Sequence, residues 1–170
     1  MSTRELRPGR DEIKHFLTFI KDQPRDLFGI LTKPKAILNF FLVEFQHRFL
    51  KNSYVAGFPY HLTIETGNFC TLHCPLCPTG QGKEGLPKGF LTFAIFKKII
   101  DELGDYLLIL ELYNWGEPFL NKEFFKMIRY ARDRNIMVTT SSNLNMSRKG
   151  RLTERFSYLC DLQKNHRRTR

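Results

Sequence analysis

The stretch YLLILELYNWGEPFLN, residues 106–121, decides how this chain folds. Its first half, YLLILELY (106–113), is an almost continuous apolar run, which is typical of a buried strand in a parallel sheet. Its second half, NWGEPFLN (114–121), contains turn-forming residues, and Asn121 is able to cap a following helix. The stretch therefore predicts a buried strand, then a polar loop, then a helix.

The same order occurs on both sides of this stretch. YHLTIET (60–66) is typical of a short strand, and after a long loop a helix is predicted from Thr92 to Gly104. NIMVTT (135–140) predicts a third strand, which the loop SSNLN (141–145) follows. Three strand-loop-helix units indicate an α/β fold with a parallel sheet and right-handed crossovers.

Polar loops follow all three predicted strands, at residues 67–91, 114–120 and 141–146. Because the carboxyl ends of parallel strands meet at one edge of the sheet, ligands bind there in α/β proteins. We therefore expect the three loops to converge on one site. Glu111 lies between Leu110 and Leu112, so it faces away from them, either toward a barrel interior or toward the helices.

The composition is that of a globular protein, with 170 residues, 42% of them hydrophobic, and sixteen Phe. No apolar run approaches the roughly 18 residues that a transmembrane segment needs, so no such segment is expected. The N-terminus is charged and lacks a secretory signal, which favours a cytoplasmic, reducing location. Clustered cysteines in such a location more often signify metal binding or catalysis than disulfides.

Two segments flank the predicted α/β region of residues 58–146. Residues 1–57 form an N-terminal helical extension, with helices expected over 11–22 and 35–51. The second helix is expected to pack on the domain, with a membrane surface as the alternative for its Phe-rich face. Its apolar stripe consists of Leu38, Phe41, Leu42, Phe45 and Phe49.

Residues 147–170 form a basic tail with eight Lys and Arg against Glu154 and Asp161. We expect the tail to be solvated, disordered or helical over 152–163. Such a tail can also bind nucleic acid, but no nucleic-acid-binding motif accompanies it, so no nucleic-acid partner is expected.

The sequence FCTLHCPLCPTG (69–80) gathers Cys70, Cys74 and Cys77 in a C-x3-C-x2-C pattern. The chain has one other cysteine, Cys160. Three thiolates can bind three irons of a [4Fe–4S] cluster and leave the fourth iron open to a ligand.

Three other interpretations of the cysteines stay open. A zinc site needs four ligands, which His73 or Cys160 would have to complete. A thiol-disulfide motif at Cys74 and Cys77 would leave Cys70 without a role. Ordinary buried cysteines are rarely this clustered.

At these residues the sequence resembles the radical S-adenosylmethionine (SAM) enzymes. The resemblance covers residues 58–146 and consists of CTLHCPLC after the first strand, WGEP after the second and a Ser/Asn loop after the third. The sequence is most similar to the subgroup that carries an additional SPASM or twitch domain, although no such cysteine-rich domain is present. The resemblance implies about three βα units, the N-terminal half of a partial TIM-like barrel, and hence a truncated or fragmentary core.

The resemblance implies that Cys70, Cys74 and Cys77 ligate a [4Fe–4S] cluster whose open iron binds SAM. Leu76 stands where the family often has an aromatic residue against the adenine. The other implied SAM-binding residues are Gly116, Glu117 and Pro118 at the ammonium group, and Ser142 and Asn143 at the ribose or carboxylate. Trp115 replaces the first glycine of the family's Gly-Gly-Glu-Pro motif.

The activity that the resemblance implies is that of an oxidoreductase. An external one-electron donor of the flavodoxin or ferredoxin type reduces the cluster, and SAM is cleaved to a 5′-deoxyadenosyl radical that abstracts hydrogen from an unknown substrate. We expect this chain to be weakly active or inactive alone. The alternative function is a non-catalytic module that binds zinc or nucleic acid.

Overall fold

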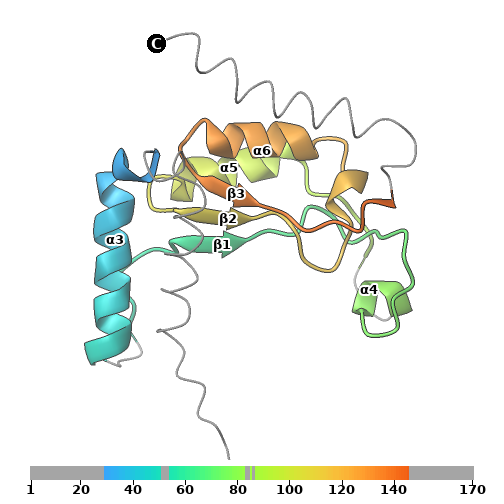
Figure 1. Ribbon diagram of the computed structural model, residues 1–170, viewed down its shortest axis with the longest axis horizontal. Coiled ribbons are helices and arrows are strands. Elements are labelled where there is room, and N and C mark those ends of the chain that lie inside the picture. Colours follow the sequence, from blue (N-terminus) through green and yellow to red (C-terminus); the bar gives the residue numbers. More distant parts are fainter. Residues whose placement is uncertain (1–28, 51–53, 83–84, 86, 146–170) are drawn as a thin grey trace, which may run out of the picture.

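A computed structural model describes residues 29–50, 54–82, 85 and 87–145 of the chain (Figure 1). The three strands of its sheet lie in the order β1-β2-β3, and neighbouring strands are parallel. The predicted parallel sheet is thus confirmed, with each strand inside its expected range. The strands are β1 (His61–Thr63), β2 (Ile109–Glu111) and β3 (Met137–Thr139).

Helices α5 (Phe93–Leu103) and α6 (Phe124–Arg132) lie over one face of the sheet (Figure 1). Alternate strand residues face them, because successive side chains of a strand point to opposite faces. The buried side chains between the helices and the sheet form an apolar core. Residues 107, 110 and 112 belong to it, which accounts for the apolar run between 106 and 113. Its buried members are Phe96, Ile100, Leu107, Leu110, Leu112, Phe119, Phe124, Met127, Ile128, Ala131 and Ile136.

The start of α5 is as predicted, but that of α6 is not. Thr92 caps α5 by accepting a hydrogen bond from the Ile95 N–H at 3.5 Å, and Gly104 ends the helix. The residue that directly precedes α6 is Glu123, so the helix begins two residues later than a cap at Asn121 would place it. The Asn121 side-chain oxygen still accepts a backbone N–H at this helix start, that of Glu123, at 2.8 Å. Its amide nitrogen donates to the carbonyls of Thr66 and Leu91, at 2.7 and 2.9 Å.

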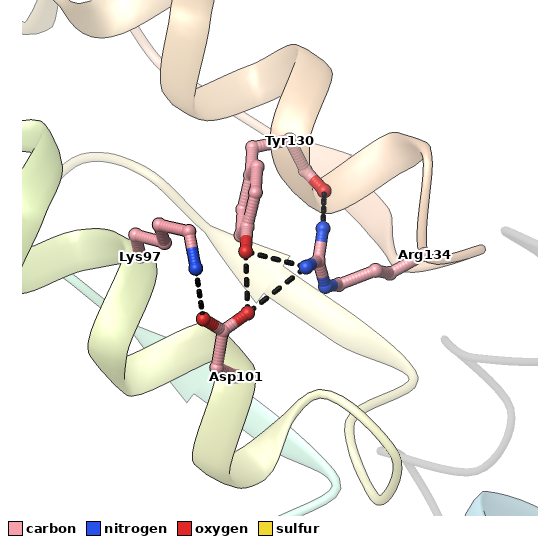
Figure 2. Close-up of polar contacts among 4 residues, drawn as sticks. All are labelled: Lys97, Asp101, Tyr130 and Arg134. Atoms are coloured by element: carbon pink, nitrogen blue, oxygen red, sulfur yellow. Dashed lines mark hydrogen bonds and ion pairs between the residues drawn. The ribbon is translucent and has the colours of Figure 1, made fainter.

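A polar network joins the exposed sides of α5 and α6 (Figure 2). Asp101 on α5 accepts hydrogen bonds from Lys97 and from the Tyr130 hydroxyl, and Arg134 donates to it at 2.9 Å. These partners hold the pKa of the Asp101 carboxyl below its usual value, with the Lys97 hydrogen bond as the largest cause. The network is solvent-exposed, so it orients the helices more than it stabilises them.

Helix α3 (Pro34–Phe45) continues as a π-helical turn, η1 (Gln46–Leu50), and stands beside the end of the sheet where the strands begin (Figure 1). The helix packs on the domain as expected, but not through its apolar stripe. Ala36 and Asn39 are buried, whereas Phe41 and Phe45 are 64% and 53% exposed. Asn39 fixes this orientation by exchanging two hydrogen bonds with the backbone of Phe58, at 2.9 and 2.8 Å.

Several predictions fall outside the described residues. These are the helix over 11–22, the tail at 147–170 with its helix over 152–163, and Cys160. Within the part of the chain that the structure describes, no helix has the length and apolar character to cross a bilayer.

Candidate functional site

The three clustered cysteines lie on the loop that follows β1, and all three are free thiols. The backbone turns sharply between two of them, because the Cys77 N–H donates to the Cys74 carbonyl at 3.2 Å. A one-turn helix, α4 (Pro78–Gln81), follows directly. It packs so closely that a Cβ on Gly80 would lie 2.6 Å from the Cys74 nitrogen, so this position requires glycine.

Two N–H groups point at the sulfur of Cys70. The Leu72 backbone N–H donates to it at 3.4 Å, and the Asn143 side-chain amide donates to it at 3.5 Å. Asn143 comes from the loop after β3, so the third loop reaches the cysteine loop. Such donors stabilise negative charge on a sulfur, which favours a metal-bound thiolate.

The loop after β2 lies against the start of the cysteine loop. A Cβ on Gly116 would lie 1.7 Å from the Gly67 carbonyl oxygen, so no side chain fits there. The next residue, Glu117, donates its backbone N–H to the Phe69 carbonyl at 2.7 Å. The second loop is therefore positioned directly beside residues 67–69, which lead into Cys70.

Glu65, just beyond β1, holds the turn at Trp115. One oxygen of the Glu65 carboxylate accepts the backbone N–H groups of Trp115 and Gly116, both at 3.0 Å. Backbone groups make these bonds, so the side chain at residue 115 is not constrained by them. This explains how Trp115 is compatible with a turn where the resembled motif has glycine.

Glu117 connects the second loop to the third. Its side chain is only 3% exposed. Its Oε1 atom accepts the Ser142 hydroxyl at 2.6 Å, and its Oε2 atom accepts the Asn143 backbone N–H at 2.9 Å. Oε1 also accepts the Phe119 N–H at 3.2 Å, at the start of the short 3-10 helix η2 (Pro118–Leu120). One buried carboxylate thus orders two loops.

The expected convergence of the three loops is confirmed by these contacts, whereas the roles of the individual residues stay predictions. Cys70, Glu117, Ser142 and Asn143 form one connected set, and Cys77 lies 3.8 Å from the Trp115 carbonyl oxygen. Gly116 and the buried Pro118 shape the second loop. Leu76, which directly precedes Cys77, is 92% exposed.

The cysteine loop offers three thiols, which are the donors that an iron–sulfur cluster requires. Among the described residues, no three His, Cys, Asp or Glu side chains lie close enough together to bind one metal ion. A cubane cluster does not need such a group, because each thiolate binds a different iron. The hydroxyl of Thr79, two residues after Cys77, is buried and has no hydrogen-bond partner within the described part of the chain. A buried hydroxyl without a partner is uncommon in folded proteins, because it has given up its hydrogen bonds to water.

A second polar group lies on the other face of the sheet. The Glu111 carboxylate accepts the Thr63 hydroxyl at 3.0 Å and lies 3.4 Å from the His61 imidazole. Glu111 therefore faces away from α5 and α6, which excludes the helix-facing orientation that the sequence left open. Burial, and then the charge and hydrogen bond of Glu111, raise the pKa of the Tyr113 phenol.

Sequence reasoning missed Glu65 as a structural residue of the site. Its signal was available: it stands at the end of a strand, two residues after Thr63 on the same face. What it binds, however, is the backbone of a loop fifty residues away, which no sequence pattern indicates.

No protein-family model matches this chain, and no curated protein or solved structure matches it either. The resemblance to radical SAM enzymes therefore depends on the motif residues of the sequence.

Proposed function

We propose that this chain is a radical SAM protein in which Cys70, Cys74 and Cys77 hold a [4Fe–4S] cluster. One observation carries the proposal: the cysteine loop, the Gly-Glu-Pro loop and the Ser/Asn loop are hydrogen-bonded to one another at the carboxyl edge of the sheet. The link runs from Cys70 to Asn143 and from there to Glu117. Three separate motifs that merely formed turns would have no reason to share these bonds.

The sheet supports a barrel-like core of the kind that the resemblance implies. Its strands follow one another in sequence order, all parallel, with α5 and α6 over one face. A TIM-like barrel also contains consecutive parallel strands with helices on one face, which supports this part of the proposal. In such a core, Glu111 and Thr63 would line the interior, where they would face SAM and the substrate.

When bound and reduced, the cluster would supply the electron for the reductive cleavage of SAM and for hydrogen abstraction from a substrate of unknown identity. Cys70, Cys74 and Cys77 would hold the cluster, and the two N–H donors at the Cys70 sulfur would stabilise the charge on that thiolate. Gly116, Glu117 and Pro118 would offer acceptors to the SAM ammonium group. The electron would come from a flavodoxin- or ferredoxin-type donor in the cytoplasm.

The remaining SAM contacts are proposed from the positions of residues on the loops. Ser142 and Asn143 would hold the ribose or carboxylate, because both are fixed by Glu117 beside the cysteine loop. Leu76 would cover the adenine, and its exposure leaves it accessible to a ligand.

Anaerobic reconstitution of the full chain with iron and sulfide tests the proposal. We expect a brown protein with about four irons per chain, as a [4Fe–4S] cluster requires. Changing Cys70, Cys74 or Cys77 to Ser should abolish the cluster, whereas Cys160→Ser is the matched control and should retain it. A colourless protein with one zinc per chain would instead support the zinc-binding alternative.

SAM binding needs its own measurement. The electron paramagnetic resonance spectrum of the reduced cluster should change when SAM is added, because SAM binds the open iron directly. A cluster that forms but does not respond to SAM would contradict the radical SAM assignment and leave an iron–sulfur protein of another kind.

A further inference from the structure

The Glu65 carboxylate binds the Gly-Glu-Pro loop through two consecutive backbone N–H groups. Its Oε1 atom accepts those of Trp115 and Gly116, both at 3.0 Å. Hydrogen bonds to a charged acceptor are about twice as strong as those between neutral groups. Because both bonds end on one oxygen atom, they fix the orientation of two successive peptide units.

This orientation decides where two backbone carbonyls point. The described residues contain no cis peptide bond, and in a planar trans peptide unit the C=O points opposite to the N–H. The carbonyls of Asn114 and Trp115 share their peptide units with the two bonded N–H groups, so both are directed away from Glu65. The Trp115 carbonyl oxygen accordingly lies 3.8 Å from the Cys77 sulfur. Glu65 therefore turns a backbone acceptor toward the third cysteine of the motif.

The N–H side of the loop is covered by residues 65–69. A Cβ on Gly116 would lie 1.7 Å from the Gly67 carbonyl oxygen, and the Glu117 N–H donates to the Phe69 carbonyl at 2.7 Å. A loop turned over in the opposite sense would lose this hydrogen bond and both bonds to the carboxylate. A ligand would therefore meet the loop on its carbonyl side.

The Glu117 side chain is less suited than this carbonyl to receive an amino group. Its two oxygen atoms already accept three donors, which are those of Phe119, Ser142 and Asn143. A ligand would have to displace one of these donors in a buried position. The Trp115 carbonyl differs, because its donor is the Cys77 thiol, and a thiol loses its proton when it binds a metal. With a cluster bound, this carbonyl would face a thiolate and be free to accept a new donor.

We propose that Glu65 is a positioning residue, which holds the Trp115 carbonyl ready to accept an N–H of the SAM amino group. This role rests on the proposed function, in which SAM binds the open iron beside the three thiolates. Glu65 does not contact SAM itself, since it acts through the two peptide units that it orients. The Glu117 side chain then orders the loops, while the backbone of residue 115 binds the ligand.

Anaerobic equilibrium dialysis of the reconstituted full chain against SAM tests the proposal. Glu65→Ala frees the two peptide units, so we expect SAM binding to weaken about tenfold, which corresponds to one hydrogen bond of about 1.4 kcal/mol. Glu65→Gln should keep most of the affinity, because the amide oxygen can still accept both N–H groups. Glu102→Ala is the matched control, since it removes an exposed carboxylate on α5 and should bind SAM as the parent chain does.

A SAM analogue in which hydrogen replaces the amino group separates positioning from a general loss of structure. Glu65→Ala should bind this analogue as tightly as the parent chain does, because neither chain can form the bond in question. Equal weakening for SAM and for the analogue, or no weakening for either, would overturn the role of Glu65. Should the Ala variant not hold a full cluster, Glu65→Asp carries the same expectation, since it withdraws the carboxylate by one methylene.

Failure of the proposed function would give a different result. A parent chain that forms no cluster, or that does not bind SAM, would refute the radical SAM assignment and the role of Glu65 together. A parent chain that binds SAM no more tightly than Glu65→Ala would leave the assignment intact and refute the role of Glu65 alone.

Discussion

Gly116 is the residue whose side chain the site can least accommodate. A Cβ there would lie 1.7 Å from the Gly67 oxygen and 2.8 Å from its carbonyl carbon, and both are backbone atoms that no rotamer change can move. We expect Gly116→Ala to separate the first two loops and to destabilise the protein by about 1–3 kcal/mol, as overpacking does. Urea unfolding measures the loss.

Gly89→Ala is the control for this prediction. A Cβ at Gly89 has nothing within 4 Å, so this change should alter the free energy of unfolding by no more than about 0.5 kcal/mol. Equal losses for the two variants would mean that the contact between Gly116 and Gly67 is not as tight as described.

Asn143 acts on the cluster through Cys70 if the proposed function holds. Its amide hydrogen bond to the Cys70 sulfur offsets negative charge, which favours the reduced cluster. Asn143→Ala should therefore lower the reduction potential, by roughly 40 mV for a hydrogen bond worth about 1 kcal/mol. Potentiometric titration of the reconstituted protein measures the shift.

Asn145→Ala is the companion variant, because Asn145 is exposed on the same loop and uses its backbone N–H in its bond to Asn143. Its potential should match that of the parent chain. If Asn143→Ala binds a full cluster at an unchanged potential, the Asn143 amide does not contact the sulfur in the loaded protein.

Among the helices, the start of α3 is tied to the segment after α5 by a half-buried ammonium, since Lys33 donates to the carbonyls of Gly104 and Leu107 at 2.7 and 2.6 Å. Burial lowers the pKa of Lys33 from 10.5 to about 8, although the nearby charge of Asp105 opposes the shift. Between these two pH values the unfolded chain binds more protons than the folded one, so the free energy of unfolding rises with pH. The rise should be about 1 kcal/mol, after allowance for solvent screening of a partly exposed group.

Lys33→Met isolates this effect, since other groups titrate equally in both chains. Urea unfolding at about pH 7.5 and about pH 10 should give a larger increase for the parent chain than for the variant. An identical increase in both chains would show that the Lys33 ammonium is as well solvated in the folded state as in the unfolded one.

The same helix shows where sequence reasoning stops at the scale of elements. The spacing of apolar residues predicted the positions of α3 and α5 and the apolar face of α6, because helical spacing depends only on residues close together in the sequence. It assigned the wrong face of α3 to the domain, because the anchors Asn39 and Glu44 are polar and look like surface residues. Their partners, Phe58 and Tyr60, lie beyond the end of the helix, so only the tertiary structure reveals them.

For the molecule as a whole, the predicted order of strands and helices indicated where the candidate site lies, which the amino-acid composition could not do. The placement of three loops at one sheet edge followed from parallel strands alone, without knowledge of any contact. The bonds that join the loops could not be predicted. Glu117 and Asn143 lie 26 residues apart, and the sequence indicated ligand binding for both but no contact between them.

This arrangement predicts that ligand binding protects all three loops together. Iron–sulfur reconstitution followed by SAM should slow amide hydrogen exchange in residues 65–82, 113–121 and 140–145, because ligand binding to the folded state stabilises every segment that the contacts couple. Mass spectrometry of peptic peptides measures the exchange. Helix α3 is the internal control, since its contacts do not include the loops.

The variant Asn143→Ala distinguishes coupling among the three loops from ligand binding at the cysteine loop alone. In this variant the protection of 140–145 should weaken while that of 65–82 persists, because the side-chain bond between the third loop and Cys70 is lost. Protection confined to 65–82 in the parent chain would mean that the cysteine loop binds its cluster independently. The contacts of Glu117 would then serve the fold of the loops and not the binding of SAM.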